Sequence, residues 1–206
     1  KWLEENWKDY GYIGKGRRAN NANNDEFVPI FYRKKAVELI DWGCFWLSET
    51  PDVAASQGWD STVPRVATWA VFKHLASGKK FFFINTHIDV GSKVAPVKSM
   101  EVIISKMSEL NPENLPMLLT ADFNKQIDSD IFDGVKKFMT NVRLSAPVTD
   151  SKHSYTGFGT ATPYIVDHIF CTGFKPLKFE TIDKVYEKIT YISDHYPIVG
   201  KLEYVK

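Results

Sequence analysis

The fold class is decided by the stretch Phe81–Asp89, which reads FFFINTHID. Its first half is aromatic and apolar, which favours a buried β-strand. Its second half adds an amide, an imidazole and a carboxylate at the point where that strand should end. Because loops fed by rigid strands are where catalytic groups are usually found, the stretch predicts a sheet with functional side chains at one strand end.

Three further apolar segments deliver small polar groups in the same way. The predicted strand Pro116–Thr120 runs into Ala121–Asn124, which reads ADFN. The predicted strand Tyr164–Cys171 contains Asp167, and an SDH tripeptide precedes the predicted strand Pro197–Tyr204. An unpaired carboxylate inside an otherwise apolar strand is costly, so Asp167 is expected to have a partner.

The rest of the chain adds helices and more strands. Helical spacing of apolar residues predicts a helix over Pro96–Leu110, and an Asp-Ser cap opens a second one over Asp128–Met139. Strands are predicted over Arg65–Leu75 and over Phe27–Arg33 and Val37–Trp42, the last two as a hairpin. Strands outnumber helices, so the fold class is α/β (α+β), with mostly antiparallel sheets in layers.

Composition indicates an ordinary globular protein. The 206 residues are 44% hydrophobic and 25% charged with a net charge of +1, which fits one domain spanning 1–206. A pI near 7.9 gives no sign of a nucleic-acid-binding stripe, for which a pI above about 9 is usual. Cys44 and Cys171 stand far apart and are expected to be core residues.

The amino terminus predicts an incomplete start. Lys1–Trp7 reads as the end of an amphipathic helix and has no initiator Met, so any targeting signal is expected upstream. No run approaches the roughly 18 apolar residues of a membrane span, so a soluble protein is expected. Whether it is cytoplasmic or exported stays open, as does its oligomeric state.

The polar groups at the strand ends match the needs of phosphoester hydrolysis, which are a positioned water, a proton acceptor and donors for the phosphoryl oxygens. Asp122 can accept a proton from water, and Asn124 can donate to the phosphate. His87 and His195 can contact the phosphoryl group, while Asp167 can hold one imidazole in a fixed tautomer.

Two further residues are candidates near this centre. Asp194 is free to face a divalent cation or its water shell, and Mg²⁺ (or Mn²⁺) is expected because hard oxygen ligands dominate the set. Arg65 either reaches the phosphate or serves as a structural ion-pair partner, and the sequence leaves both open.

Seven motifs together resemble the endonuclease/exonuclease/phosphatase superfamily, whose fold is also called DNase I-like. The likeness covers nearly the whole chain and is greatest to bacterial members. The motifs are FYRK at 31–34, FWLSETPD at 45–52, PRVATW at 64–69, NTHID at 85–89, ADFN at 121–124, VDHIF at 166–170 and SDHYPIV at 193–199.

The resemblance implies a four-layer sandwich of two β-sheets flanked by helices, and metal-dependent cleavage of a phosphodiester or phosphomonoester. It implies that Asp122 orients or activates water and that Asn124 and His87 stabilise phosphoryl oxygens. His195, held by Asp167, would act as base or as a transition-state donor. It further implies that Asp194 lies toward the metal and that Asn85 lines the same pocket.

The family pattern begins with a strand that carries an Asn, followed by a strand that ends in Gln-Glu, whose Glu is the principal metal ligand. Neither strand is found in this sequence. Glu4, Glu5 and Glu26 stand in other contexts. The domain is therefore expected to lack its first strands, and the chain as it stands to bind metal weakly and catalyse poorly.

Two rival functions remain at this stage. A dinuclear metallohydrolase would use His87, Asp89, Asp122, the Asp167-His168 pair and the Asp194-His195 pair as direct ligands. A phosphate-binding module would keep the pocket without catalysis. The sequence does not decide whether the phosphoester belongs to a small molecule, a lipid or a nucleic acid.

Overall fold

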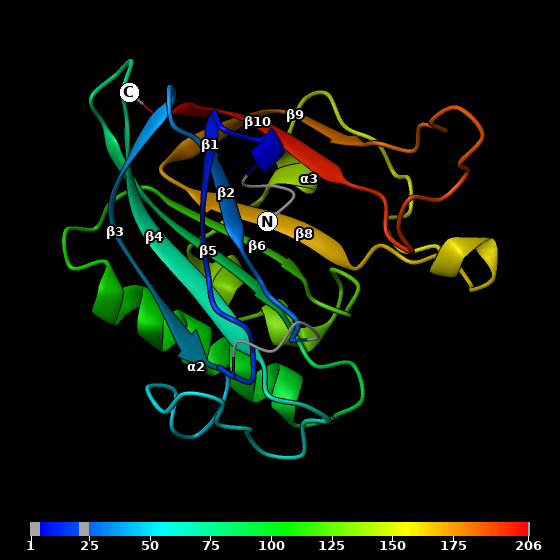
Figure 1. Cartoon of the computed structure of the whole chain (residues 1–206), viewed down its shortest axis with the longest axis horizontal. Helices are drawn as coiled ribbons and strands as arrows, with labels where there is room; N and C mark the ends of the chain where they lie inside the picture. Colours follow the sequence, from blue (N-terminus) through cyan, green and yellow to red (C-terminus); the bar gives the residue numbers. More distant parts are fainter. Residues whose placement is uncertain (1–4, 21–24, 206) are drawn as a thin grey trace.

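The computed structural model describes residues 5–20 and 25–205. Its main sheet has six strands in the order β3-β4-β5-β6-β8-β7 (Figure 1). The bounds are Val37–Trp46 for β3, Val66–His74 for β4, Lys80–His87 for β5, Met117–Asp122 for β6, Thr140–Asn141 for β7 and Asp167–Thr172 for β8. The strands that the sequence predicts at β3, β4, β5, β6 and β8 are confirmed, whereas β7 was not predicted.

Helix α2 (Ala95–Leu110) explains why the sheet is mixed. It connects β5 to β6, and a helical crossover of this kind leaves the two strands parallel, whereas the other neighbours are antiparallel. Its buried Met100, Ile103 and Met107 pack against Phe82 and Leu119 on one face of the sheet. The predicted helix over Pro96–Leu110 is thus confirmed, and it covers that face.

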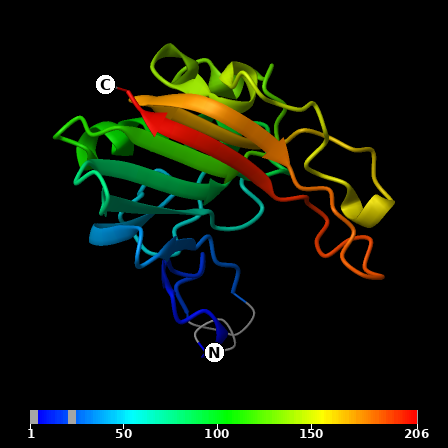
Figure 2. The same cartoon turned by 90° about the horizontal axis from the view of Figure 1, so that it is seen from above.

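The opposite face carries two antiparallel strand pairs (Figures 1 and 2). One pair is β1 (Tyr10–Ile13) with β2 (Ile30–Arg33), and the other is β9 (Phe174–Thr181) with β10 (Ile198–Tyr204). Ile13 packs with Phe72 of β4, and Phe179 packs with Ile169 of β8. The predicted layered α/β class with mostly antiparallel strands is confirmed; within the described residues the second layer consists of these two pairs.

The predicted hairpin of Phe27–Arg33 with Val37–Trp42 is wrong. The strand formed at Ile30–Arg33 pairs with β1, while Val37 lies opposite His74 of β4. Ile30 packs against the face of the main sheet, and β3 is part of that sheet, so the turn between β2 and β3 carries the chain from one layer to the next.

The predicted helix over Asp128–Met139 is also wrong. The segment forms two 3₁₀ turns, η1 at Asp130–Phe132 and η2 at Val135–Lys137. A Cβ at Gly134 would lie 2.7 Å from Cδ1 of Ile104 in α2, so the chain approaches α2 closely at this residue. Packing against α2 therefore outweighs helical continuity. The helix expected over Lys1–Trp7 lies mostly outside the described residues.

His168 should make the fold sensitive to acid. The residue is 2% exposed, its Nε2 lies 3.0 Å from the Lys125 carbonyl, and burial lowers its pKa to about 4. The unfolded chain takes up a proton on this residue near pH 6.5, and the folded protein does so only near pH 4. Its contribution to the free energy of unfolding is therefore fully present above pH 6.5 and decreases as the pH falls to 4. The difference corresponds to roughly 3 kcal/mol.

Urea unfolding at pH 7 and pH 4 tests this expectation. His168→Gln should lose less stability on acidification than the wild type, because glutamine has no proton to gain. The exposed His153 provides the control His153→Gln, which should behave as the wild type does. An acid-induced loss as large in His168→Gln as in the wild type would contradict the assignment.

Candidate active site

Three of the predicted site residues form one row across the main sheet. His87 at the end of β5 lies opposite Asp122 at the end of β6, and Asp122 lies opposite Asp167 at the start of β8. Side chains paired in this way point to the same face about 5 Å apart. The row follows from the strand order, because parallel β5 and β6 end together and antiparallel β8 begins where they end.

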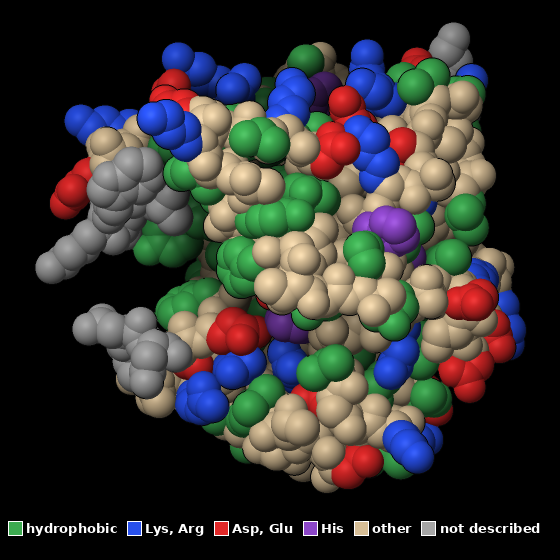
Figure 3. All heavy atoms as spheres, turned by 90° about the vertical axis from the view of Figure 1, so that its right-hand side faces the viewer, with side chains coloured by type: hydrophobic (Ala, Val, Ile, Leu, Met, Phe, Trp, Pro, Cys, Tyr) green, Lys and Arg blue, Asp and Glu red, His purple; other side chains and the backbone are tan. Residues whose placement is uncertain are grey.

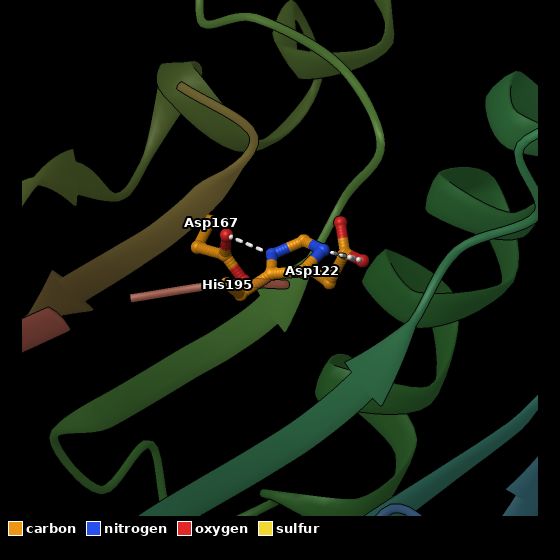
Figure 4. Close-up of side chains that lie close together, drawn as sticks. All are labelled: Asp122, Asp167 and His195. Atoms are coloured by element: carbon orange, nitrogen blue, oxygen red, sulfur yellow. Dashed lines mark hydrogen bonds and ion pairs between the residues drawn. The ribbon is translucent and has the colours of Figure 1, made fainter. Parts of the chain in front are cut away.

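His195 completes the row from outside the sheet. Its Nδ1 lies 2.7 Å from Oδ2 of Asp167, and its Nε2 lies 3.7 Å from Oδ2 of Asp122. Figure 4 shows the ring between the two carboxylates. The hydrogen bond to Asp167 raises the pKa of His195, with the charges of Asp167 and Asp122 acting in the same direction against partial burial. Asp167 thus has the partner that its place in an apolar strand required.

His87 has a carboxylate partner of its own, Glu26. Oε1 of Glu26 lies 3.0 Å from Nδ1 of His87, and Nε2 of the same ring lies 3.2 Å from Oδ2 of Asp122. Asn124 Nδ2 lies 3.1 Å from the same Nε2, so this nitrogen faces both an amide N–H group and a carboxylate. Asp122 therefore lies between two imidazoles, each backed by another carboxylate.

Glu26 was not identified from the sequence. It stands in the segment before the short strand β2, and no local pattern links that segment to His87. The signal that was available is an acidic residue beside the apolar run from Phe27 to Phe31, where its charge needs a partner. Its second oxygen accepts from Arg17 Nη1 at 2.7 Å.

Asp122 is the central carboxylate. Oδ1 accepts the backbone N–H of Asn124 at 2.8 Å, which leaves Oδ2 facing both imidazoles. Burial raises the pKa of Asp122; Asp167 adds to this effect, and His87 and His195 oppose it. A carboxylate of raised pKa is a better proton acceptor than an ordinary one.

Asn85 and Asn124 lie in the same region, but their amide groups are engaged. Asn124 adopts a left-handed conformation (φ 52°), and its Nδ2 lies 2.9 Å from the Ile88 carbonyl as well as near His87. Asn85 donates to the Pro29 carbonyl at 3.0 Å and accepts from Thr120 Oγ1 at 2.8 Å. Asn85 thus ties the residue before β2 to the main sheet at the edge of the site.

Arg65 lies behind the row, with its side chain 7% exposed. Its Nε is 3.4 Å from Oδ2 of Asp89, and its Nη1 is 3.5 Å from Oε1 of Glu26. Of the two interpretations left open, this geometry matches the ion-pair partner. Asp194 adjoins His195, and its Oδ1 accepts from Ser193 Oγ at 3.2 Å.

The row opens on a cavity of about 300 Å³ lined by Asn85, Thr120, Asp122, Asp167 and Ile169 among others. The molecular face at the right of Figure 1 bears histidine side chains with acidic and basic groups nearby (Figure 3). Space beside a proton acceptor, under imidazole donors, is what a phosphoryl group and an attacking water need.

The same residues provide donors that suit a divalent cation. Within the described residues, the acidic and imidazole atoms close enough to share an ion belong to Asp122, Asp167 and His195, all within 4.8 Å of one another. Two carboxylates suit Mg²⁺, which keeps several of its waters and takes few protein ligands. The donor set fits such an ion, although the Asp167–His195 bond already occupies two of its atoms.

Two ligands of the rival dinuclear site are engaged elsewhere. The fully buried Asp89 carboxylate accepts from Thr62, Gly91 and Ser92 and pairs with Arg65. The ring of His168 packs among phenylalanines on the other side of β8. Neither belongs to the group of atoms that converge on Asp122, so the geometry disfavours a dinuclear site built from them.

Comparison of the sequence with protein families and curated proteins does not identify the chain, and the helices of the described residues do not point to a membrane. Among residues 5–20 and 25–205, no helix is long and apolar enough to cross a bilayer. No protein-family model matches the chain. No curated protein matches its sequence.

Solved structures give clear matches. An endonuclease/exonuclease/phosphatase from Bacteroides vulgatus is 32% identical with a TM-score of 0.89, over 98% of this chain and 79% of that one. A mannosyl-6-phosphatase from Bacteroides thetaiotaomicron is 32% identical with a TM-score of 0.88, over 98% and 80% of the two chains. The human Nocturnin catalytic domain with bound sulfate, 12% identical over 98% and 74%, shares the fold with a TM-score of 0.74.

Identity above 30% over nearly the whole chain, together with this fold, confirms the resemblance carried by the seven motifs. The chain belongs to the endonuclease/exonuclease/phosphatase family.

Proposed function

We propose that this protein hydrolyses a phosphoester by attack of water on phosphorus, with Asp122 as the proton acceptor. The observation that carries the proposal is the position of the Asp122 carboxylate, with Oδ2 at 3.2 Å from His87 Nε2 and 3.7 Å from His195 Nε2. A base between two imidazoles suits hydrolysis, because it can accept a proton from water while the imidazoles interact with the phosphoryl oxygens.

Each imidazole has a distinct task in the proposed reaction. His195, fixed through Nδ1 by Asp167, directs Nε2 toward Asp122, where it exchanges a proton with the water or the phosphoryl group. His87 stabilises a phosphoryl oxygen once a substrate displaces the Asn124 contact from its Nε2. Asn124 then donates its freed amide N–H to the phosphate, as the sequence predicts.

Mg²⁺ (or Mn²⁺) is the proposed cofactor. Asp167 and Asp194 would face the ion or its water shell, which leaves Asp122 free to accept the proton. Such an ion neutralises charge on the phosphoryl oxygens when it is bound. Support for this assignment comes from the convergence of the carboxylates and from the chemistry of the donor set.

A sugar phosphomonoester is the proposed substrate class. The mannosyl-6-phosphatase is as similar to this chain as any relative described above, at 32% identity. A net charge of +1 also offers little general attraction for polyanionic nucleic acid. Duplex DNA and lipid phosphodiesters are the classes that this proposal ranks lower.

A substrate panel tests the proposal. The complete gene product is stripped of metal with a chelator and assayed with mannose 6-phosphate, glucose 6-phosphate, a nitrophenyl phosphodiester and DNA, with and without Mg²⁺ or Mn²⁺. We expect metal-dependent phosphate release from the sugar phosphates, lost in Asp122→Ala and His195→Ala. Equal turnover by the wild type and both variants would reject the site. Binding of phosphate without any turnover would favour the phosphate-binding module.

Glu26→Gln should lower kcat by about 10- to 100-fold, because glutamine still accepts from His87 Nδ1 but no longer stabilises positive charge on the ring. The exposed Glu38, which pairs with Lys73 on β4, gives the control Glu38→Gln. Steady-state kinetics on the best substrate measure both. A kcat for Glu26→Gln within twofold of the wild type would show that this carboxylate has no part in the reaction.

A further inference from the structure

The Asp167–His195 pair joins two segments that the strands alone do not hold together. Asp167 is the first residue of β8, whereas His195 lies in the irregular segment between β9 and β10. Their atoms nevertheless lie 2.7 Å apart. Some other part of the chain must fix this distance, and the segment 154–157 contacts both residues' backbones.

Ser154 binds the backbone at Asp167. Its hydroxyl oxygen accepts the backbone N–H of Val166 at 3.2 Å and that of Asp167 at 3.1 Å. Its own backbone N–H donates to the Tyr164 carbonyl at 3.0 Å, and the residue is 0% exposed. One buried hydroxyl thus provides the acceptor for two N–H groups at the start of β8.

The same segment also binds the backbone of the two residues that flank His195, Asp194 and Tyr196. The Asp194 carbonyl accepts from the backbone N–H of Thr156 at 2.8 Å, from that of Gly157 at 3.2 Å and from Thr156 Oγ1 at 3.0 Å. Tyr196 donates its backbone N–H to the Ser154 carbonyl at 2.7 Å. The peptide units on either side of His195 are therefore fixed.

The Tyr155 ring packs against the imidazole between these bonds. The two ring centroids are 5.0 Å apart, with an interplanar angle of 56°. The backbones of Tyr155 and His195 also form an isolated antiparallel bridge. Rotation of the imidazole away from Asp167 is thus opposed by contacts from the segment that also holds Asp167.

We propose that Ser154 and Thr156 are positioning residues that keep His195 in register with Asp167 by clamping the backbones of both. This inference rests on the proposed function only for its kinetic consequence. Neither hydroxyl needs to touch substrate, since both act through the two residues they hold. Misplacement of a catalytic group by about 1 Å lowers rates by as much as 10²-fold, so the expected effect falls on kcat.

Four variants separate positioning from general stability. Ser154→Ala removes the acceptor of two N–H groups, and Thr156→Val removes one of three donors to Asp194 while keeping the side-chain shape. Thr156→Ser keeps that hydroxyl. Ser48→Ala is the matched control, because Ser48 is likewise buried (1% exposed) and its hydroxyl accepts a backbone N–H, from Thr50, at 3.0 Å.

The first readout is kinetic. Ser154→Ala should lower kcat tenfold or more and Thr156→Val about threefold, each with KM within twofold, while Thr156→Ser restores the wild-type kcat. Ser48→Ala should lower the unfolding temperature about as much as Ser154→Ala without changing kcat. Wild-type kcat in both Ser154→Ala and Thr156→Val would overturn the proposal, as would an equal loss of kcat in Ser48→Ala.

The second readout does not need activity. The Nδ1–H proton of His195, held against Asp167, should give a downfield proton NMR signal that His195→Gln removes. Its exchange with solvent should be at least tenfold faster in Ser154→Ala than in the wild type and in Ser48→Ala. Equal exchange rates in all three would overturn the proposal. If the wild type hydrolyses no phosphoester, the proposed function fails, and this exchange rate alone decides on the clamp.

Discussion

Asp122→Asn should lower kcat/KM for the best phosphoester by about 10³-fold or more. Asparagine has nearly the same shape, and its Oδ1 still accepts the backbone N–H that Asn124 gives to Asp122. It cannot take a proton from water, and it offers neither imidazole a charged partner. The loss is therefore expected in the chemical step and not in the fold.

Steady-state kinetics and thermal unfolding separate the two effects for Asp122→Asn. The unfolding temperature should stay within a few degrees of the wild type, because the side chain lies at a strand end beside the cavity. The exposed Asp133, at the end of η1, supplies the control Asp133→Asn. Retention of more than a tenth of wild-type kcat/KM in Asp122→Asn would remove this residue from the role of proton acceptor.

Asp167→Asn should lower kcat by about 10²- to 10⁴-fold. The Asn amide can donate to Nδ1 of His195, which would move the ring proton to Nε2 and reverse the polarity of the nitrogen that faces Asp122. The hydrogen bond that Asp167 accepts from His195 is also the largest cause that raises the pKa of His195. Its loss should therefore let that pKa fall toward its ordinary value.

The pH dependence of kcat tests Asp167→Asn further and also identifies the task of His195. The part of the pH–kcat profile that is set by the titration of His195 should move to lower pH in the variant. If His195 acts as a donor, wild-type activity falls as the pH rises through its raised pKa; if it acts as a base, activity falls as the pH drops through it. An unchanged profile in Asp167→Asn would contradict the pairing of these two residues.

The row of His87, Asp122 and Asp167 was predictable because its signals are local. Each residue follows or opens an apolar run, and alternation along a strand decides which face a side chain occupies. The resemblance to the family implied that these residues share one site, and the neighbouring positions of β5, β6 and β8 in the sheet explain why they do.

The roles of Glu26, Ser154 and Thr156 could not be predicted from the sequence, because these roles depend on tertiary contacts alone. Glu26 reaches His87 from another layer, and Ser154 satisfies backbone groups that every residue carries. The wrong helix over Asp128–Met139 has a similar cause. Its periodicity was suitable, but close packing of Gly134 against Ile104 favoured two short 3₁₀ turns.

The attack of water on phosphorus is tested most directly by the fate of oxygen. The complete gene product is allowed to hydrolyse a sugar phosphomonoester in H₂¹⁸O with Mg²⁺, and both products are analysed by mass spectrometry. We predict one ¹⁸O atom in each phosphate released and none in the sugar. Label in the sugar hydroxyl with unlabelled phosphate would mean that carbon is attacked, and would contradict the role given to Asp122 and its two imidazoles.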